Sequence, residues 1–179
     1  ENGSYLDVMA KYSRLSVDFD IREMSGSYDN NGMSISVEGG HKFSLSDSIF
    51  VEPQVAITYG YLSGDDFKSA NGVKIEQDDF NSLIGRIGFR AGYSGLEDRM
   101  HAYVKASVLH DFIGDMDSKF TSMITGTSVN LSDNFGDTWV EYGVGGSFAF
   151  TDRANGYAEF ERTSGGSLDE NWRFNVGFR

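Results

Sequence analysis

The stretch TWVEYGVGGSF, residues 138–148, places one carboxylate in the middle of a run that otherwise looks suited to burial. In a β-strand, successive side chains point to opposite faces. One face of this stretch would carry Val140, Tyr142, Val144 and Phe148. The other face would carry Glu141, Gly143, Gly145 and Ser147. The pattern predicts a wall with water or packed polar groups on one side and an apolar environment on the other.

The overall composition narrows the class of protein. The chain has 179 residues, which suits one domain or a large piece of one. It has no cysteine, which excludes disulfide bridges and thiolate metal sites. The net charge of −12, without a clustered basic stripe, argues against nucleic acid as a partner. We expect no cofactor.

A transmembrane helix is excluded, because no segment approaches about 18 consecutive apolar residues. A membrane β-barrel is a different case, since it hides its apolar residues at alternate positions and its average resembles that of a soluble protein. The mean hydropathy of −0.36 is therefore compatible with a barrel.

Period-two alternation recurs along the whole chain and predicts eight strands. They cover roughly residues 4–15, 32–46, 48–61, 80–94, 100–113, 137–151, 155–164 and 171–179. Strands of soluble domains usually have about five or six residues, whereas a tilted membrane-spanning strand needs roughly 9 to 11. The predicted lengths favour the membrane.

The connections between these strands alternate between short and long. The short ones are 46–48, 94–99 and 151–155, and the long polar ones are 16–31, 62–79 and 114–136. Short turns on one rim and long loops on the other are typical of outer-membrane barrels. Three unstructured loops of this length would be rare in a compact soluble domain.

The faces of the strands support this interpretation. Aromatic residues lie near strand ends, as in the girdles at membrane interfaces: Tyr59, Tyr61, Tyr93, Phe112, Phe150 and Trp172. The polar faces collect the acids Asp7, Glu38, Glu52, Asp111, Glu141, Glu159 and Glu161. They also collect the bases Lys11, Lys42, Arg86, Arg90, Lys105, Arg173 and Arg179. A confined lumen needs such a balance, because unpaired charge at low dielectric is costly.

We therefore predict an all-β fold, an antiparallel up-and-down transmembrane β-barrel with about eight strands. The alternative with the same alternation is a soluble β-sandwich or lipocalin-like binder. That alternative would fold without detergent and bury its apolar face inside the protein.

Six segments carry a resemblance to a known family. They are VEPQVAITYG (51–60), SLIGRIGFRAG (82–92), VKASVLHDF (104–112), WVEYGVGGSF (139–148), AEFERTSGG (158–166) and WRFNVGFR (172–179). In this order they resemble the C-terminal translocator barrel of bacterial autotransporters, most closely the pertactin-like branch. The resemblance spans nearly the whole chain.

The resemblance implies a type V secretion protein of the Gram-negative outer membrane, whose barrel anchors the protein and supports export of an N-terminal passenger. In this family the barrel has twelve strands, a linker helix lies in the lumen, and the barrel-assembly machinery recognises the last strand. The eight strands match the last eight of the twelve. We therefore expect residues 1–179 to be a translocator domain that lacks its first strands and linker helix, and that stops short of the usual terminal aromatic.

Two groups of residues are the candidate sites. The lumen-facing group is Glu52, Arg86, Arg90, Lys105, Glu141, Glu159 and Glu161. It would contact the linker helix, or would form a structural network that neutralises itself. The proposed assembly-recognition strand carries Trp172, Phe174, Val176 and Phe178, which would look the same in an ordinary lipid-facing strand.

We expect no enzyme and no metal site. Glu159 and Glu161 share one face as an acid/base pair could, but such pairs are more often salt-bridged. The three histidines, on or near the lipid-facing phase, lack the convergent spacing of metal ligands. The acidic loop 63–79 lacks the spacing of a calcium loop, although it could meet cations that bridge lipopolysaccharide.

Two further functions stay open from the sequence. The first is a free-standing small outer-membrane barrel that acts through its loops as an adhesin or resistance factor, which would need the first and eighth strands to pair. The second is an outer-membrane enzyme, which would need a convergent histidine and acid near the long-loop rim, and the sequence shows none. Outer-membrane lipid and lipopolysaccharide are expected partners.

Overall fold

The computed structural model describes residues 3–21, 24–96, 99–134, 136–151, 153–166 and 172–178. In this part of the chain no helix is long and apolar enough to cross a membrane. The strands are β1 (Ser4–Ile21), β2 (Met24–His41), β3 (Phe43–Ser44), β4 (Ile49–Leu62), β5 (Asp66–Lys68), β6 (Val73–Gln77), β7 (Phe80–Gly95), β8 (Met100–Asp111), β9 (Asp115–Ser122), β10 (Ser128–Asn134), β11 (Thr138–Thr151), β12 (Ala154–Ser164) and β13 (Arg173–Phe178).

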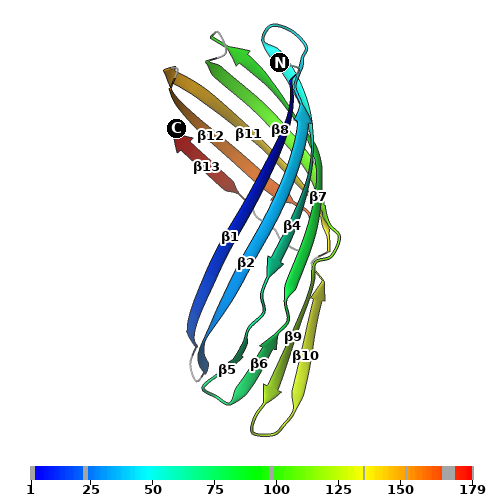
Figure 1. The fold of residues 1–179 in the computed structure, drawn as a ribbon, viewed down its shortest axis with the longest axis vertical. Coiled ribbons are helices and arrows are strands. Elements are labelled where there is room, and N and C mark those ends of the chain that lie inside the picture. Colours follow the sequence, from blue (N-terminus) through cyan, green and yellow to red (C-terminus); the bar gives the residue numbers. More distant parts are fainter. Residues whose placement is uncertain are drawn as a thin grey trace.

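The long strands form one antiparallel sheet in the order β1-β2-β4-β7-β8-β11-β12-β13, and the short β3 pairs with β4. The sheet curls into a trough, with both chain ends near the same rim (Figure 1). Within the described residues β1 and β13 do not pair, so the sheet is an open half-barrel. The predicted antiparallel, membrane-barrel type of sheet is confirmed, and closure of these eight strands on themselves is not observed.

The two faces of the curled sheet differ as the alternation predicts. Among the described residues, the buried hydrophobic side chains are Phe50, Ile75 and Leu109 alone. The convex face instead exposes long rows of apolar side chains, such as Val55, Ile57, Ile87 and Phe89. A water-soluble domain would cover rows of this kind, because large contiguous apolar patches are rare on soluble surfaces. The exposed rows therefore suit a lipid environment.

The sequence predicts that the long connections are loops, but the structure shows that most of their described residues form β-strands. The β1–β2 hairpin keeps its register from Ser4↔His41 to Ile21↔Met24, although β2 pairs with β4 only as far as Gly32↔Leu62. Residues 16–21 and 24–31 therefore continue β1 and β2 beyond the larger sheet. Segments 62–79 and 114–136 form a second, four-stranded sheet in the order β10-β9-β6-β5. Hairpin pairing satisfies the backbone of these polar segments, which contain short alternations that we interpreted as loop.

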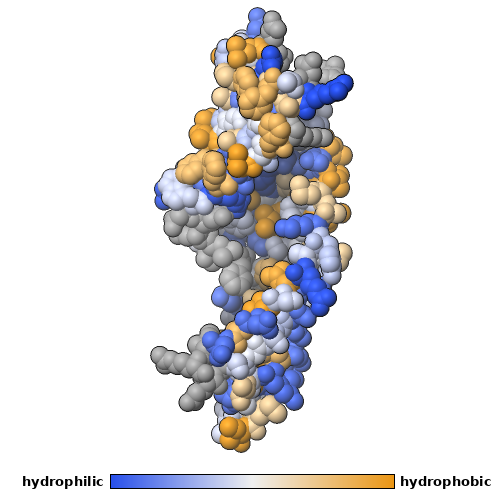
Figure 2. All heavy atoms as spheres, turned by 90° about the vertical axis from the view of Figure 1, so that its left-hand side faces the viewer, coloured by the Kyte–Doolittle hydropathy of each residue, from blue (hydrophilic) through white to orange (hydrophobic). Residues whose placement is uncertain are grey.

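The second sheet and the end of the β1–β2 hairpin together form an extension below the trough (Figure 1). Phe67 on β5 stacks on Tyr28 at 5.1 Å and meets Phe19 edge-on at 5.8 Å, measured between ring centroids. The backbone N–H of Ala70 also donates to the carbonyl of Ser25 at 3.0 Å. Figure 2 shows mainly hydrophilic residues on the viewed face of this extension and more hydrophobic patches on the body above it.

Candidate functional site

The concave face of the trough carries a first group of ion pairs on β2, β4 and β7. Register places Glu52 opposite Arg90, and their side chains meet at 2.7 Å. Arg86 lies four residue pairs further along β7, opposite Ala56, and reaches Glu38 on β2 at 2.5 Å. Arg86 also donates to the amide oxygen of Gln54 at 3.3 Å. Arg90 is therefore held by a carboxylate on the adjacent strand β4, whereas Arg86 is held by Gln54 on β4 and by Glu38 on β2, the next strand but one.

A second group lies on β8, β12 and β13. The ammonium of Lys105 contacts Glu159 at 2.9 Å and Glu161 at 2.5 Å. Glu161 also lies 3.7 Å from Arg173, and accepts from the amide of Asn175 at 3.3 Å. Glu161 is buried, so these contacts offset the cost of removing its charge from water. Three strands are tied together by one lysine and two carboxylates.

Glycines of β11 make the second group geometrically feasible. Gly143 lies between Lys105 on β8 and Glu161 on β12, so the lysine crosses β11 without meeting a side chain. Gly145 lies in the same way between Tyr103 and Glu159, and the tyrosine hydroxyl donates to Glu159 at 2.6 Å. Gly143 and Gly145 therefore allow side chains of β8 and β12 to meet across the concave face of β11.

The concave face repeats this arrangement of an aromatic ring over a glycine. A Cβ at Gly145 would lie 2.6 Å from the Tyr103 ring. The other instances are Tyr5 over Gly40, Phe50 over Gly92 and Tyr157 over Gly177. The small size of Gly143 and Gly145 predicts, from the sequence alone, room in the lumen for a linker segment. At Gly145 the Tyr103 ring occupies that space instead, because a glycine allows a flat aromatic side chain to lie against the sheet. At Gly143 the contact between Lys105 and Glu161 occupies it.

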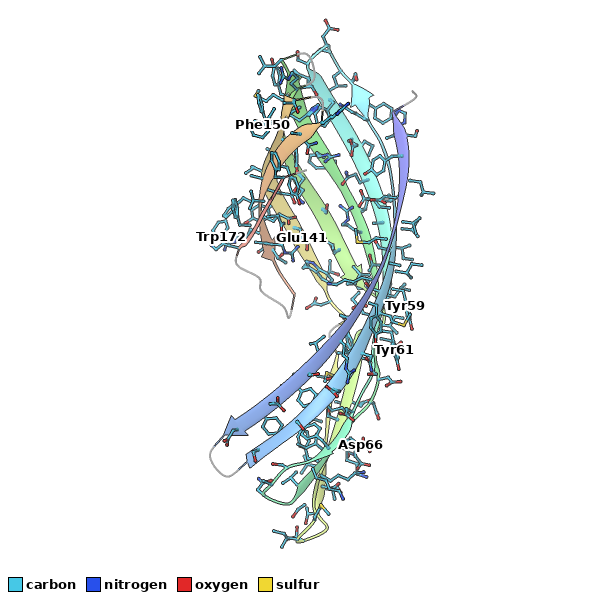
Figure 3. All side chains as sticks on the ribbon, turned by 60° about the vertical axis from the view of Figure 1, so that its left-hand side comes forward. Tyr59, Tyr61, Asp66, Glu141, Phe150 and Trp172 are labelled. Atoms are coloured by element: carbon cyan, nitrogen blue, oxygen red, sulfur yellow. The ribbon has the colours of Figure 1, made fainter. Side chains whose placement is uncertain are left out.

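The lumen-facing residues predicted from the sequence are thus largely brought together. Glu52, Arg86, Arg90, Lys105, Glu159 and Glu161 all take part in ion pairs. Glu141 differs: it lies opposite Ser107 and Thr163, is partly exposed, and no described residue forms a hydrogen bond or salt bridge with its carboxylate. Figure 3 shows Glu141 on the trough side of the sheet. Among the seven residues predicted to face the lumen, Glu141 alone has no partner in the described part of the chain.

Other predicted lumen charges behave differently. Asp111 is buried, accepts from the Ser82 hydroxyl at 2.6 Å and from the Leu83 backbone at 3.0 Å, and forms no ion pair with a described residue. Lys42 lies over the Phe50 ring, 4.5 Å from its centroid. Arg179 lies outside the described residues.

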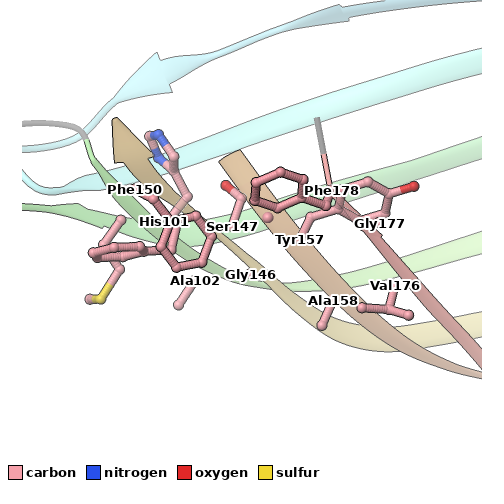
Figure 4. A pocket seen from close by; sticks show the side chains of 13 residues that line it. His101, Ala102, Gly146, Ser147, Phe150, Tyr157, Ala158, Val176, Gly177 and Phe178 are labelled. Atoms are coloured by element: carbon pink, nitrogen blue, oxygen red, sulfur yellow. The ribbon is translucent and has the colours of Figure 1, made fainter. Parts of the chain in front are cut away.

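The predicted recognition strand faces outward. Exposure of Trp172, Phe174, Val176 and Phe178 ranges from 57% to 74%. Figure 3 shows Trp172 on the outside of the curled sheet. At the short-turn rim a hollow of about 810 Å³ is lined by residues of β8, β11, β12 and β13, among them Phe150, Tyr157, Val176 and Phe178 (Figure 4). This hollow borders the unpaired edge of the sheet.

The histidines pair with hydroxyl groups of adjacent strands. His41 bonds Ser4 at 2.7 Å, and His110 bonds Thr138 at 2.8 Å. His101 bonds Ser94 at 3.0 Å, and by alternation it shares the concave face with Tyr103, so its expected place in the lipid-facing phase was wrong. In the described part of the chain no three metal-binding side chains converge.

In the extension, charged groups form exposed clusters. Lys74 contacts Glu76 at 2.6 Å and Asp66 at 3.3 Å. The hydrogen bond from Lys74 holds the pKa of Glu76 below its ordinary value, and the bond to Glu76 raises the pKa of Lys74. The backbone N–H of Gly64, and then the Tyr61 hydroxyl, lower the pKa of Asp79.

Comparison with known proteins bears on what this arrangement does. A family model described as the autotransporter beta-domain matches residues 1–161. The pertactin autotransporter of Bordetella parapertussis is 29% identical over 99% of this chain and 20% of its own length. The probable autotransporter YcgV of Escherichia coli is 30% identical over 100% of this chain and 19% of its own length. The chain thus spans about a fifth of the curated relatives it matches.

A solved structure shares the fold. The crystal structure of the β-domain of the Bordetella autotransporter BrkA superimposes with a TM-score of 0.71 at 22% sequence identity. The match covers 99% of this chain and 67% of that chain. The curled sheet is therefore a known architecture, and the other structure contains more chain than this one.

Proposed function

The chain belongs to the autotransporter β-domain family, and we propose that it serves as the outer-membrane translocator of a type V secretion protein. In this role it anchors the protein in the membrane and supports export of an N-terminal passenger. The observation that carries the proposal is the division of the sheet into two faces. Its convex face exposes apolar rows suited to lipid, and its concave face holds paired charges suited to a narrow polar conduit.

We also propose that further strands complete the barrel. An open sheet in a bilayer leaves the backbone groups of its edges without hydrogen bonds, at a cost of several kcal/mol each. In the described residues β1 and β13 are such edges. The greater length of the BrkA β-domain supports additional strands between them. A free-standing eight-stranded barrel would need β1 to pair with β13.

Completion of the barrel has a direct test. Residues 1–179 and the full-length protein are refolded in detergent, and their gel mobility is compared before and after heating. We expect a compact, heat-sensitive and protease-resistant band from the full-length protein only. The same band from residues 1–179 alone would show that eight strands close by themselves, and would favour the free-standing barrel.

Glu141 is the residue that we propose for contact with a linker segment in the lumen. The other six residues of the predicted lumen-facing group, Glu52, Arg86, Arg90, Lys105, Glu159 and Glu161, already take part in ion pairs, so they act mainly as the structural network. Glu141 has no partner among the described residues, and a basic or amide group on a linker helix would supply one. We propose the barrel-assembly machinery as the partner that inserts the domain, with the outward aromatics of 172–178 as its recognition element.

Export itself is tested in cells that carry the full-length protein. Protease is added to intact cells, and passenger fragments are followed with an antibody. Under the proposal the passenger is digested while the β-domain stays protected. Passenger that stays protected in intact cells, with the β-domain inserted, would contradict the translocator function.

A further inference from the structure

Arg162 on β12 is an unusual residue on the convex face. Glu161 points into the trough and pairs there with Lys105, so alternation places Arg162 outside, beside Phe160. Among the described residues of β4, β7, β8, β11, β12 and β13, no other outward position carries Lys, Arg, Asp or Glu. A charge on a surface that faces lipid is expensive near the middle of a bilayer and tolerated near its interface.

The position of Arg162 along the strand is near that interface. Arg162 pairs with Tyr142 two residues before β12 ends at Ser164. This end leads into the connection 165–172, on the rim that carries the long connections and the extension. Long connections of outer-membrane barrels lie on the extracellular side. Arg162 therefore lies at the headgroup level of the outer leaflet.

The surroundings of Arg162 form a small apolar groove with one cationic end. The groove has a volume of about 390 Å³, and the outward side chains that line it are Val104, Tyr142, Val144, Phe160, Arg162 and Trp172. The guanidinium lies 5.1 Å from the centroid of the Trp172 ring, which itself stacks on Phe160 at 4.6 Å. Stacking of this kind orients the planar guanidinium and leaves its edge available for hydrogen bonds.

That edge has no acceptor in the described part of the chain. The Nε of Arg162 is buried without a hydrogen-bond partner, and no described carboxylate forms a salt bridge with its guanidinium. A guanidinium without an acceptor on an apolar face is costly, so an acceptor from outside the chain would be favourable at its two terminal nitrogens, which are not buried as Nε is. The bidentate geometry of arginine suits phosphate oxygens in particular.

We propose that Arg162 and Trp172 form a binding site for the phosphate group of an outer-leaflet lipid, with the adjoining acyl chain in the apolar groove. In the outer membrane this lipid is lipopolysaccharide, through the phosphate of its lipid A part. The proposal rests on the proposed function, since the convex face must lie in the outer membrane. Such a site would hold a lipid molecule against β12 and β13, next to the unpaired edge of the sheet.

The test measures lipid retention by the refolded full-length protein. Protein is reconstituted with diphosphorylated lipid A, with enzymatically dephosphorylated lipid A, or in detergent with inorganic phosphate alone, and bound lipid is counted by native mass spectrometry. The variants are Arg162→Gln, Arg162→Lys and Arg153→Gln. Arg153 is the matched control, because it is an exposed arginine in the turn at the opposite rim.

We expect the wild type and Arg153→Gln to retain phosphorylated lipid A roughly tenfold to a hundredfold better than Arg162→Gln does, as loss of a charge-assisted hydrogen bond implies. Retention by Arg162→Lys should be intermediate, because lysine keeps the positive charge but lacks the planar guanidinium that can form two parallel hydrogen bonds. Equal retention by Arg162→Gln and wild type would overturn the proposal. So would equal retention of dephosphorylated lipid by the wild type, a comparison that needs no variant to fold.

The gel-mobility assay separates this site from the proposed function. If the wild type gives a normal heat-sensitive band but shows no preference for phosphorylated lipid A, the lipid-site proposal is rejected and the translocator proposal stands. Failure of the wild type to insert at all would remove both. Saturation by inorganic phosphate in detergent would assign the site to a free anion, and would contradict the lipid proposal.

Discussion

Lys105 and Glu161 meet at 2.5 Å although their strands, β8 and β12, do not pair with each other. The contact spans β11, and it passes over Gly143, which lies opposite both residues. A sheet normally couples a side chain to its two adjacent strands. Here a glycine extends the coupling to the next strand but one, so the charged network stiffens the wall across three strands.

Replacement of Lys105 tests the importance of that contact. Lys105→Met leaves two partly buried carboxylates close together, and we expect it to lower the free energy of unfolding by about 3 kcal/mol. The measurement is the urea dependence of the heat-sensitive band of the full-length protein. The double variant Lys105→Met/Glu161→Gln should recover part of the loss. Strict additivity of the two single changes would show that the residues are not coupled.

Gly145→Ala tests the packing of rings over glycines. The new Cβ would lie 2.6 Å from the Tyr103 ring, so the ring must move and its hydrogen bond to Glu159 is strained or lost. We expect destabilisation of about 1–3 kcal/mol in the same urea assay. Gly60→Ala is the control, because its Cβ would meet only ordinary contact at 3.8 Å from Ser82. Equal effects of the two alanines would refute the packing argument.

The sequence was sufficient for much of this architecture, for a physical reason. Alternation is a local property, so the outward row that ends in Val176 and Phe178 and the inward charges such as Glu52 and Arg90 could be assigned without coordinates. The ring over Gly145 and the crossing from Lys105 could not, because both depend on which residues lie opposite one another across two strand pairs. The only available signal was the tyrosine and glycine content of the inward faces.

The extension was missed for a different reason. Segments 62–79 and 114–136 are rich in polar residues and alternate only over short runs, and polarity without a long alternation is also typical of loops. Their strands become recognisable through pairing with each other, such as Ile75 with Phe120, which is a contact across 45 residues. Alternation alone places Arg162 outward, but its stacking on Trp172 and its lack of an acceptor among the described residues depend on the structure.

The extension should be sensitive to acid. The pKa of Glu76 and that of Asp79 are lowered in the folded state, so each contributes stability that is present above its ordinary value of 4.5 or 3.8 and is lost as pH falls further. We expect hydrogen exchange in 63–79 to increase below about pH 4.5, while the trough strands remain protected. Glu76→Gln should remove part of this pH dependence. An extension equally protected at pH 3 and pH 7 would contradict the argument.

Glu141 and Glu159 should respond differently to neutralisation. Glu159→Gln removes the charge that pairs with Lys105 and leaves one amide oxygen for two donors, Lys105 and Tyr103, so it should destabilise the barrel. Glu141→Gln breaks no contact with a described residue, so we expect stability within about 0.5 kcal/mol of the wild type. If Glu141 binds the linker segment, the same variant should slow the appearance of passenger at the cell surface. A normal rate of passenger exposure in Glu141→Gln would remove Glu141 from the export step.

The outward aromatics of the last strand should matter for assembly more than for stability. Phe178 remains 74% exposed, so Phe178→Ser removes little packing within the protein, and we expect the variant to refold in detergent as the wild type does. In cells we expect a several-fold drop in inserted barrel, because the proposed recognition element for the assembly machinery is damaged. The measurement is the amount of heat-sensitive β-domain in isolated outer membranes.

Val55→Ser is the matched control for this prediction. Val55 is also outward-facing and 58% exposed, but it lies on β4, far from the last strand in the order of the sheet. Loss of an apolar side chain to lipid affects both variants, whereas loss of recognition affects Phe178→Ser alone. If both variants insert equally poorly in cells, the last strand acts only as a lipid-facing strand. A defect confined to Phe178→Ser supports recognition of the last strand by the assembly machinery.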